Sequence, residues 1–195
     1  MAFIPRHNIT VDGSGHVSLA KNLVMSDGNV SFANGHGIDF SANTDDGGTS
    51  SGNGVFEDYE EGTWTPHIIG STSSSSTHAT LAQDKASYTK VGNVVTLTFY
   101  ISISALNGIT GSMRLANIPY QASAQGSANQ HICTGSMMVN SFDLTTNKNW
   151  VVPYISDSAT DIKFYQSGDQ TGWVETTSTN LAGAAMIGEV MYRTV

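Results

Sequence analysis

The stretch from Val94 to Ser104 alternates apolar and polar residues along its whole length. Its apolar members are Val95, Leu97, Phe99, Ile101 and Ile103. A strict period of two over eleven residues is typical of a β-strand with one buried and one solvated face. Gly92-Asn93 precedes it and is a two-residue hairpin signal, so Ser87–Val91 is expected to pair with this strand.

Six further segments have the length and apolar content of strands, and polar, glycine-rich turns separate them. They are Thr63–Ile69, Ser112–Ile118, His131–Val139, Trp150–Ile155, Ile162–Gln166 and Ala184–Thr194. No segment has a helical period, and charged residues make up only 12% of the chain. Ser, Thr, Asn and Gly take their place, which favours strands joined by tight turns. The expected fold class is all-β, with this part forming an antiparallel, jelly-roll-like β-sandwich.

Residues 1–42 have another pattern, in which pairs of apolar residues recur every six to eight positions between turns rich in Gly and Asn. Each pair predicts a very short strand, and the spacing suits a β-roll or an intertwined β-segment. One chain cannot enclose so thin a segment in a core, so we expect a homotrimer that buries the pairs. The expected anchoring and interface residues are Val17, Leu19, Leu23, Met25, Val30, Phe32, Ile38 and Phe40. The alternative is a polar arm without regular structure.

Composition divides the chain into three parts. Residues 43–54 contain only Gly, Ser, Thr, Asn and Asp, and residues 43–57 are therefore expected to form a linker. The linker separates an N-terminal anchoring and trimerisation segment, residues 1–42, from a β-sandwich head, residues 58–195.

The charge and the cysteine content exclude several classes of protein. The formal net charge is −8 and the eight Lys and Arg residues are scattered, which argues against a nucleic-acid partner. No apolar run reaches the roughly 18 residues of a membrane span, and residues 1–6 do not resemble a secretory signal. Cys133 has no second cysteine to pair with and is expected to be a small buried residue. The protein is expected to be made in a cytoplasm, without membrane insertion.

The head opens with Asp58–Pro66, which reads Asp-Tyr-Glu-Glu-Gly-Thr-Trp-Thr-Pro. The hairpin Tyr88–Asn93, the alternating strand and a turn at Leu115–Pro119 follow it. This series resembles the distal β-sandwich of tail-fibre and tailspike proteins of tailed bacteriophages, especially cyanophages, and of related trimeric capsid cement proteins. Residues 28–32 and 37–41 are similar to the repeats that lead into such heads.

The resemblance implies a homotrimer with a β-structured stalk and a head exposed on the virion. Because only about 42 residues precede the linker, we expect first a non-enzymatic capsid cement, or decoration, protein. Its partners would be its own copies and the major capsid protein, its location the outer capsid surface, and its head would contact host glycans. The alternative is a receptor-binding tail-fibre or tailspike tip that joins tail proteins and recognises host polysaccharide. A depolymerase is a third, more distant alternative.

No pattern in the chain predicts a catalytic residue, a cofactor or a metal. Gly48–Gly52 matches G-x-S-x-G, but the linker lacks the strand and helix that would project a nucleophilic serine. Asn43–Gly47 resembles the start of a calcium loop, yet Gly54 stands where such a loop needs glutamate. The six histidines have no ligand spacing. One acidic cluster fits a solvated turn or a subunit contact better than a glycosidase pair: Glu57, Asp58, Glu60 and Glu61.

The tryptophans are the candidates for recognition. Trp150 and Trp173 lie beside polar, turn-rich sequence, and Asp169 and Gln170 shortly precede Trp173. Indole rings stack on the apolar faces of sugars, while carboxylates and amides bond their hydroxyls. These four residues form the expected glycan-binding site, and a packed indole is the alternative reading of either ring. Trp64 is expected in the core or at a subunit interface.

Overall fold

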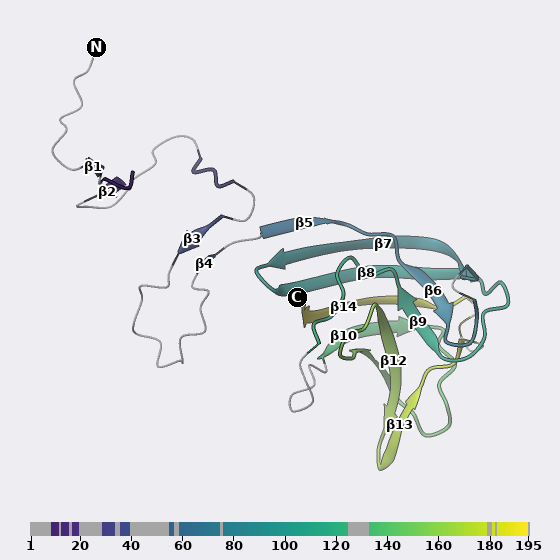
Figure 1. Ribbon diagram of the computed structural model, residues 1–195. Helices are drawn as coiled ribbons and strands as arrows, with labels where there is room; N and C mark the ends of the chain where they lie inside the picture. The colour runs from purple at the N-terminus through teal and green to yellow at the C-terminus, as the bar shows by residue number, and fades with distance from the viewer. Residues whose placement is uncertain are drawn as a thin grey trace. The chain divides into compact units, whose positions relative to one another are not determined.

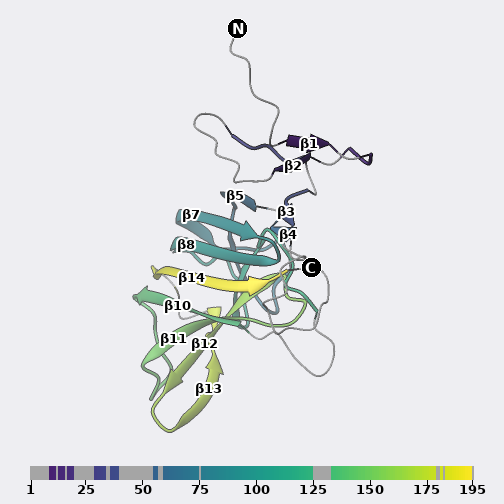
Figure 2. The ribbon, with the colours of Figure 1, turned by 90° about the vertical axis from the view of Figure 1, so that its left-hand side faces the viewer.

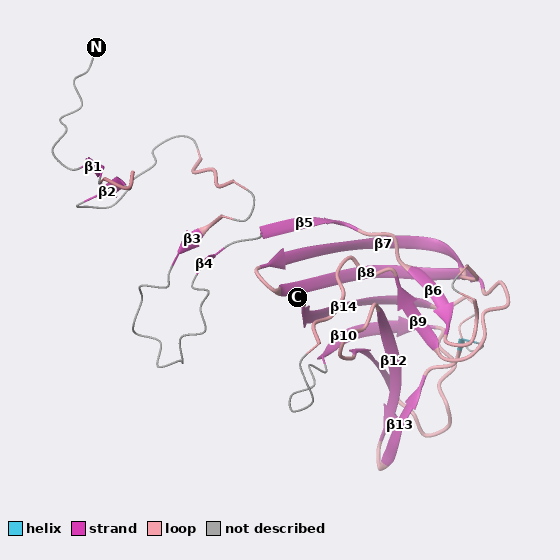
Figure 3. Cartoon of the chain, in the orientation of Figure 1, coloured by secondary structure: helices cyan, strands magenta, loops and turns pink. Residues whose placement is uncertain are grey.

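The computed structural model describes residues 9–11, 13–15, 17–19, 29–33, 36–39, 55–56, 59–74, 76–124, 133–178, 181 and 183–194. The chain forms two compact units, Met1–Ala33 and Asn34–Val195. The described residues contain fourteen β-strands and no α-helix (Figure 1, Figure 3), which confirms the all-β prediction. Within these ranges no helix is both long and apolar enough to cross a membrane.

The described residues of the N-terminal unit include a small hairpin. Strand β1 (Ile9–Val11) pairs antiparallel with β2 (Val17–Leu19), and Val11 lies opposite Val17. The segment around Val30 and Phe32, expected as a strand, belongs to no ladder among the described residues. A β-roll or intertwined segment therefore stays a prediction.

The anchoring residues that can be located are exposed in the single chain. Val17 exposes 59% of its surface, Val30 and Phe32 each 51%, and Ile38 47%. The side chains of Leu19, Leu23, Met25 and Phe40 lie outside what the structure describes. The exposure agrees with the argument that one chain cannot bury these pairs, while the trimer itself is untested.

The second unit begins with a short ladder. Strand β3 (Ile38–Asp39) pairs antiparallel with β4 (Val55–Phe56). Val55 and Phe56 fall inside residues 43–57, so a part of the range expected as linker is paired.

The head is one antiparallel sheet. Its first half runs in the order β5 (Tyr59–Thr63), β7 (Thr80–Val91), β8 (Val94–Ala105), β14 (Ala185–Arg193) and β10 (Cys133–Asn140). Its second half continues in the order β11 (Trp150–Ile155), β12 (Asp161–Gly168), β9 (Met113–Ala116) and β6 (His67–Gly70). Strand β13 (Thr171–Glu175) forms a hairpin with β12.

The alternating segment forms β8 as predicted. Its apolar face, from Val95 to Ile103, is at most 3% exposed. Val91 pairs with Val94 across a tight turn in which Gly92 adopts a φ of 56°. This conformation suits glycine because it lacks a Cβ.

Strand β10 joins the two halves of the sheet. Its first residues, Cys133 and Thr134, pair with β11, whereas Gly135–Asn140 pair with β14. A Cβ on Gly135 would lie 2.0 Å from the carbonyl oxygen of Glu189, so glycine permits the close approach at this change of partner. The ladder is thus continuous, and the two-sheet, jelly-roll-like sandwich is not confirmed.

The sheet curls into a half-barrel (Figure 1, Figure 2). Strands β5 and β6 form its two opposite edges, yet only Trp64–Pro66 separates them in the chain. A segment this short spans at most about 14 Å, so the two edges lie near each other. The prediction of one strand over Thr63–Ile69 is wrong, because the chain leaves one edge and enters the other around Pro66, which has no N–H for a ladder.

The inner faces of both halves share one hydrophobic core. The first half contributes Leu97 and Val190, and the second contributes Ile162 and Phe164, all at most 1% exposed. Trp64 is 8% exposed and packs in this core, as expected from the sequence. The outer face of the second half remains available to solvent, and it carries the candidate site.

Candidate functional site

A cleft of about 390 Å³ lies on the outer face of the second half of the sheet. Four neighbouring strands, β10 to β13, supply its lining. The lining residues are Thr134, Trp150, Val152, Tyr154, Tyr165, Ser167 and Trp173. Its volume falls in the lower part of the range of small-ligand pockets.

The alternation of side chains along strand β11 decides which of its residues line the cleft. Trp150, Val152 and Tyr154 point outward because Val151 and Ile155, between and beside them, are buried. Across the ladder, Trp150 pairs with Ser167, Val152 with Tyr165, and Tyr154 with Thr134. The cleft is therefore a set of adjacent outward positions fixed by strand register.

Four aromatic rings dominate the lining. The rings of Tyr154 and Tyr165 meet edge to face, with centroids 5.3 Å apart. Trp150 is 50% exposed and Trp173 is 78% exposed. Large apolar rings left in water beside a cleft are typical of a recognition surface, and both indole faces can accept a planar or ring-shaped partner.

The hairpin that carries Trp173 is braced from the side. The ammonium of Lys148, a largely buried residue, donates to the carbonyl oxygen of Gly172. The backbone N–H of Asn149 donates to the carbonyl of Ser167 at 2.8 Å. A Cβ on Gly168 would lie 1.9 Å from the carbonyl oxygen of Asn147, so only glycine allows this contact. The segment Asn147–Asn149 thus contacts both the end of β12 and, through Lys148, strand β13, and this support reduces the ordering cost of binding.

The structure brings together part of the predicted site. Trp150 and Trp173, 23 positions apart in the chain, line the same cleft. Asp169 and Gln170 form the exposed tip of the β12–β13 hairpin, outside the lining, and Gln170 has a φ of 52°. The prediction of Asp169 and Gln170 rests only on their closeness in sequence to Trp173. The sequence does not predict the other lining residues, because knowing which outward residues of neighbouring strands are adjacent requires the strand register.

A charged cluster lies beside the cleft and includes the lining residue Tyr165. Glu175 receives hydrogen bonds from Tyr165 Oη at 3.0 Å and from Arg114 Nη2 at 3.1 Å. Burial raises the pKa of Glu175, but hydrogen bonds from Ser112, Arg114 and Tyr165 outweigh it, so the net pKa is lowered. Burial likewise raises the pKa of Tyr165, and its bond to Glu175 adds to this. We call Glu175, Arg114 and Tyr165 the Glu175 cluster.

The described part of the acidic motif has a structural role. Tyr88 Oη donates to Glu60 Oε1 at 2.8 Å, and Tyr120 Oη donates to Glu60 Oε2. These two bonds lower the pKa of Glu60, that from Tyr120 contributing more. Lys90 Nζ lies 5.6 Å from the centre of the Tyr120 ring. We call Glu60, Tyr88, Tyr120 and Lys90 the Glu60 cluster; Glu57 and Asp58 lie outside the described residues.

The Glu60 cluster joins the three motifs that carried the family resemblance. Glu60 comes from Asp58–Pro66, Tyr88 opens the Tyr88–Asn93 hairpin, and Tyr120 directly follows the Leu115–Pro119 turn. The three motifs therefore contribute the contacts that hold the edge strand β5 in place. They do not contribute a residue to the cleft.

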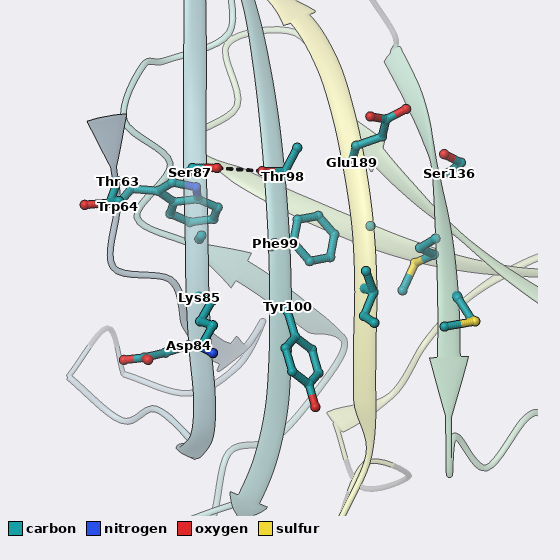
Figure 4. A pocket seen from close by; sticks show the side chains of 15 residues that line it. Thr63, Trp64, Asp84, Lys85, Ser87, Thr98, Phe99, Tyr100, Ser136 and Glu189 are labelled. Atoms are coloured by element: carbon teal, nitrogen blue, oxygen red, sulfur yellow. Dashed lines mark hydrogen bonds between the residues drawn. The ribbon is translucent and has the colours of Figure 1, made fainter. Parts of the chain in front are cut away.

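A second, shallower trough of about 950 Å³ lies over the first half of the sheet (Figure 4). One row across its strands is Lys85, Tyr100, Ile187 and Met138. The next row is polar, and Ser87 and Thr98 share a hydrogen bond of 2.7 Å. The two carboxylates of this trough, Asp84 and Glu189, are both exposed, so neither has the apolar surroundings of a glycosidase acid.

The other chemical patterns yield no site in the described part of the chain. Gly48–Gly52 and Asn43–Gly47 lie outside it. His67 and His78 stack at 4.6 Å. No group of three or more His, Cys, Asp or Glu side chains that could hold a metal ion occurs among the described residues.

Comparison with known proteins gives a likeness of fold. No family model matches the chain, and no curated protein matches it at a significant level. The crystal structure of the Dettilon tailspike protein superposes with a TM-score of 0.51 at 11% sequence identity. The match covers 70% of this chain but only 24% of the tailspike. The chain thus has a tailspike-like β fold and corresponds to about a quarter of that protein.

Proposed function

We propose that the protein is a non-enzymatic structural component of a phage virion whose head attaches the particle to polysaccharide on the host surface. The observation that carries this proposal is the outward cleft between Trp150 and Trp173, on a half-barrel whose fold resembles part of a tailspike. Exposed indoles in a braced cleft suit the ring faces of sugars.

The tail is the favoured location on the particle. The fold likeness is to a tailspike, which supports the receptor-binding alternative more than the capsid cement role. The cement role, with the major capsid protein as partner, rested on the short N-terminal segment and stays a prediction. The cyanophage origin likewise rests on the sequence resemblance alone.

Trimerisation belongs to the same proposal. Val17, Val30 and Phe32 leave about half or more of their surface exposed in one chain, and the apolar row through Tyr100, Ile187 and Met138 is a further surface that a neighbouring copy would cover. A sedimentation mass of three chains at micromolar concentration is expected. A mass of one chain under these conditions would overturn the trimer.

Glycan binding tests the proposal directly. The purified chain should bind at least one polysaccharide on an array of host-surface glycans, and Trp173→Ala should weaken that binding at least tenfold with its β-sheet circular dichroism unchanged. Tyr59→Ala, which removes a ring that is 61% exposed on the edge strand β5, is the matched control and should bind normally. Failure to bind any cell-surface polysaccharide would contradict the recognition role.

Immunogold labelling of intact virions tests the location. Labelling at the tail is expected, and labelling over the capsid would restore the cement role.

A further inference from the structure

We infer that the cleft binds an uncharged sugar ring between Trp150 and Trp173 and discriminates against anionic sugars. This inference rests on the proposed role in glycan recognition and adds the chemical class of the ligand.

The lining itself carries no formal charge. The seven lining residues are four aromatic residues, one valine and two hydroxyl residues, Thr134 and Ser167. A sugar carboxylate or sulfate moved into such a surface would lose hydration without gaining a cation. A neutral ring loses less, because its apolar face can stack on indole and its hydroxyls can bond Thr134 and Ser167.

Of the cations beside the cleft, Arg114 and Lys148 already have an anionic or a carbonyl partner. Lys163 lies opposite Tyr154 across the β11–β12 ladder, outside the lining, with Asp161 close to it. Arg114 is bonded to Glu175, with its Nη2 3.1 Å and 3.3 Å from the two carboxylate oxygens. The ammonium of Lys148 donates to the carbonyl of Gly172. An anionic sugar would have to compete with these partners, and the formal charge of −8 on the chain opposes its approach.

The Glu175 cluster also orients Tyr165, one of the two tyrosines that line the cleft. Tyr165 Oη donates its proton to Glu175 Oε1 at 3.0 Å. The hydroxyl of Tyr165 therefore offers acceptor lone pairs, while the ring meets that of Tyr154 edge to face. Lone pairs favour ligand hydroxyl groups over ligand carboxylates.

The geometry also favours a saccharide over an apolar peptide as occupant. Two indoles whose faces are open to water, with hydroxyl groups beside Val152, fit a ligand that is apolar on its ring faces and polar at its rim. An apolar peptide would leave both hydroxyl groups without a partner, which is costly when they are buried by the ligand.

The test compares neutral and anionic glycans with the full chain. An array carrying neutral hexose and N-acetylhexosamine oligomers together with uronic, sialylated and sulfated oligomers is probed with the wild type, Trp150→Ala, Trp173→Ala and Tyr59→Ala. We expect binding to neutral oligomers, at least tenfold weaker in both tryptophan variants and unchanged in Tyr59→Ala. Tryptophan fluorescence titrated with the best neutral oligomer should change in the wild type.

The outcomes separate this inference from the proposed function. Preferential binding of anionic oligomers, lost in Trp173→Ala, would overturn the inference and leave glycan recognition standing. Neutral binding that survives both tryptophan substitutions would place the site elsewhere and also overturn the inference. No binding to either class would contradict the proposed function itself. Trp173→Phe keeps an aromatic ring at this position and should therefore retain more affinity than Trp173→Ala. This difference would show that the loss in the alanine variant comes from the missing ring and not from a folding defect.

Discussion

The two halves of the sheet each contain a glutamate that accepts hydrogen bonds from tyrosine, and they use it differently. In the first half, Tyr88 and Tyr120 both donate to Glu60, and their rings meet edge to face at 5.6 Å. In the second half, Glu175 binds only one of the cleft tyrosines, Tyr165. The rings of the Glu60 cluster pack against one another and the core, whereas those of the cleft form a surface.

The difference follows from where the aromatic residues stand relative to the curl. The Glu60 cluster fastens the edge strand β5 to the turn after β9, and Tyr192 adds a 2.8 Å bond from its hydroxyl to the carbonyl of Tyr120. The Glu175 cluster lies on the outer face and leaves Trp150 and Trp173 exposed. The same residue types therefore stabilise the fold in one half and form a candidate binding surface in the other.

The largest expected contrast is between two aromatic truncations. Tyr120→Ala removes a ring that packs on Tyr88, faces Lys90 and bonds Glu60, and should lower the free energy of unfolding by about 2 kcal/mol. Trp173→Ala removes a ring that is 78% exposed and should change it by less than about 0.5 kcal/mol. Urea unfolding followed by circular dichroism measures both. Equal losses would remove the distinction between the two halves.

Backbone space gives a second, smaller contrast. A Cβ on Gly62 would lie 2.9 Å from Cε1 of Tyr88, so Gly62→Ala should displace that ring at a cost of about 1 to 2 kcal/mol. Gly172→Ala, in the Trp173 hairpin, meets nothing within 4 Å and serves as the matched control, with an effect under about 0.5 kcal/mol. Thermal or urea unfolding of the two variants decides between them. A neutral Gly62→Ala would show that Tyr88 is not held in place.

Strands were predicted best where the local sequence alone, through apolar–polar alternation or a turn dipeptide, indicates a strand. The alternation of Val94–Ser104 and the Gly92-Asn93 turn correctly predicted β8 and its hairpin, and Trp150–Ile155 is found with the predicted bounds. The first part of β7, residues 80–86, is absent from the predicted strand because its apolar residues are few and its ladder shifts register twice. Local patterns do not record such shifts.

Arrangement was harder to predict than the strands themselves. The change of partner at Gly135 and the passage through Trp64–Pro66 decide that the sheet curls as one ladder, and neither is a local preference. For the site, exposed tryptophans in turn-rich sequence were recognisable. Their meeting with Tyr154 and Tyr165 required the register of β11 with β12.

The smallest expected effects concern the loss of stability at low pH, to which Glu60 and Glu175 should contribute in the same direction. The pKa values of both Glu60 and Glu175 are lowered from the usual 4.5, so the folded state favours their ionised forms. Their contribution to stability is present above pH 4.5 and is lost as the pH falls through the lowered folded-state pKa. Glu60→Gln and Glu175→Gln should each make the urea midpoint less dependent on pH below that value.

Asp161 is the control for these two variants, because its pKa is shifted in the opposite direction. Burial raises its pKa, although Arg114 and Lys163 oppose the shift. A raised folded-state pKa favours the protonated form, so this contribution is present at low pH and is lost as the pH rises through the folded-state value. Asp161→Asn should therefore steepen the loss of stability on acidification, where the two glutamine variants reduce it. If Glu175→Gln steepened it as well, the bonds from Arg114 and Tyr165 would not be stabilising the carboxylate, and the two clusters would differ in chemistry as well as in place.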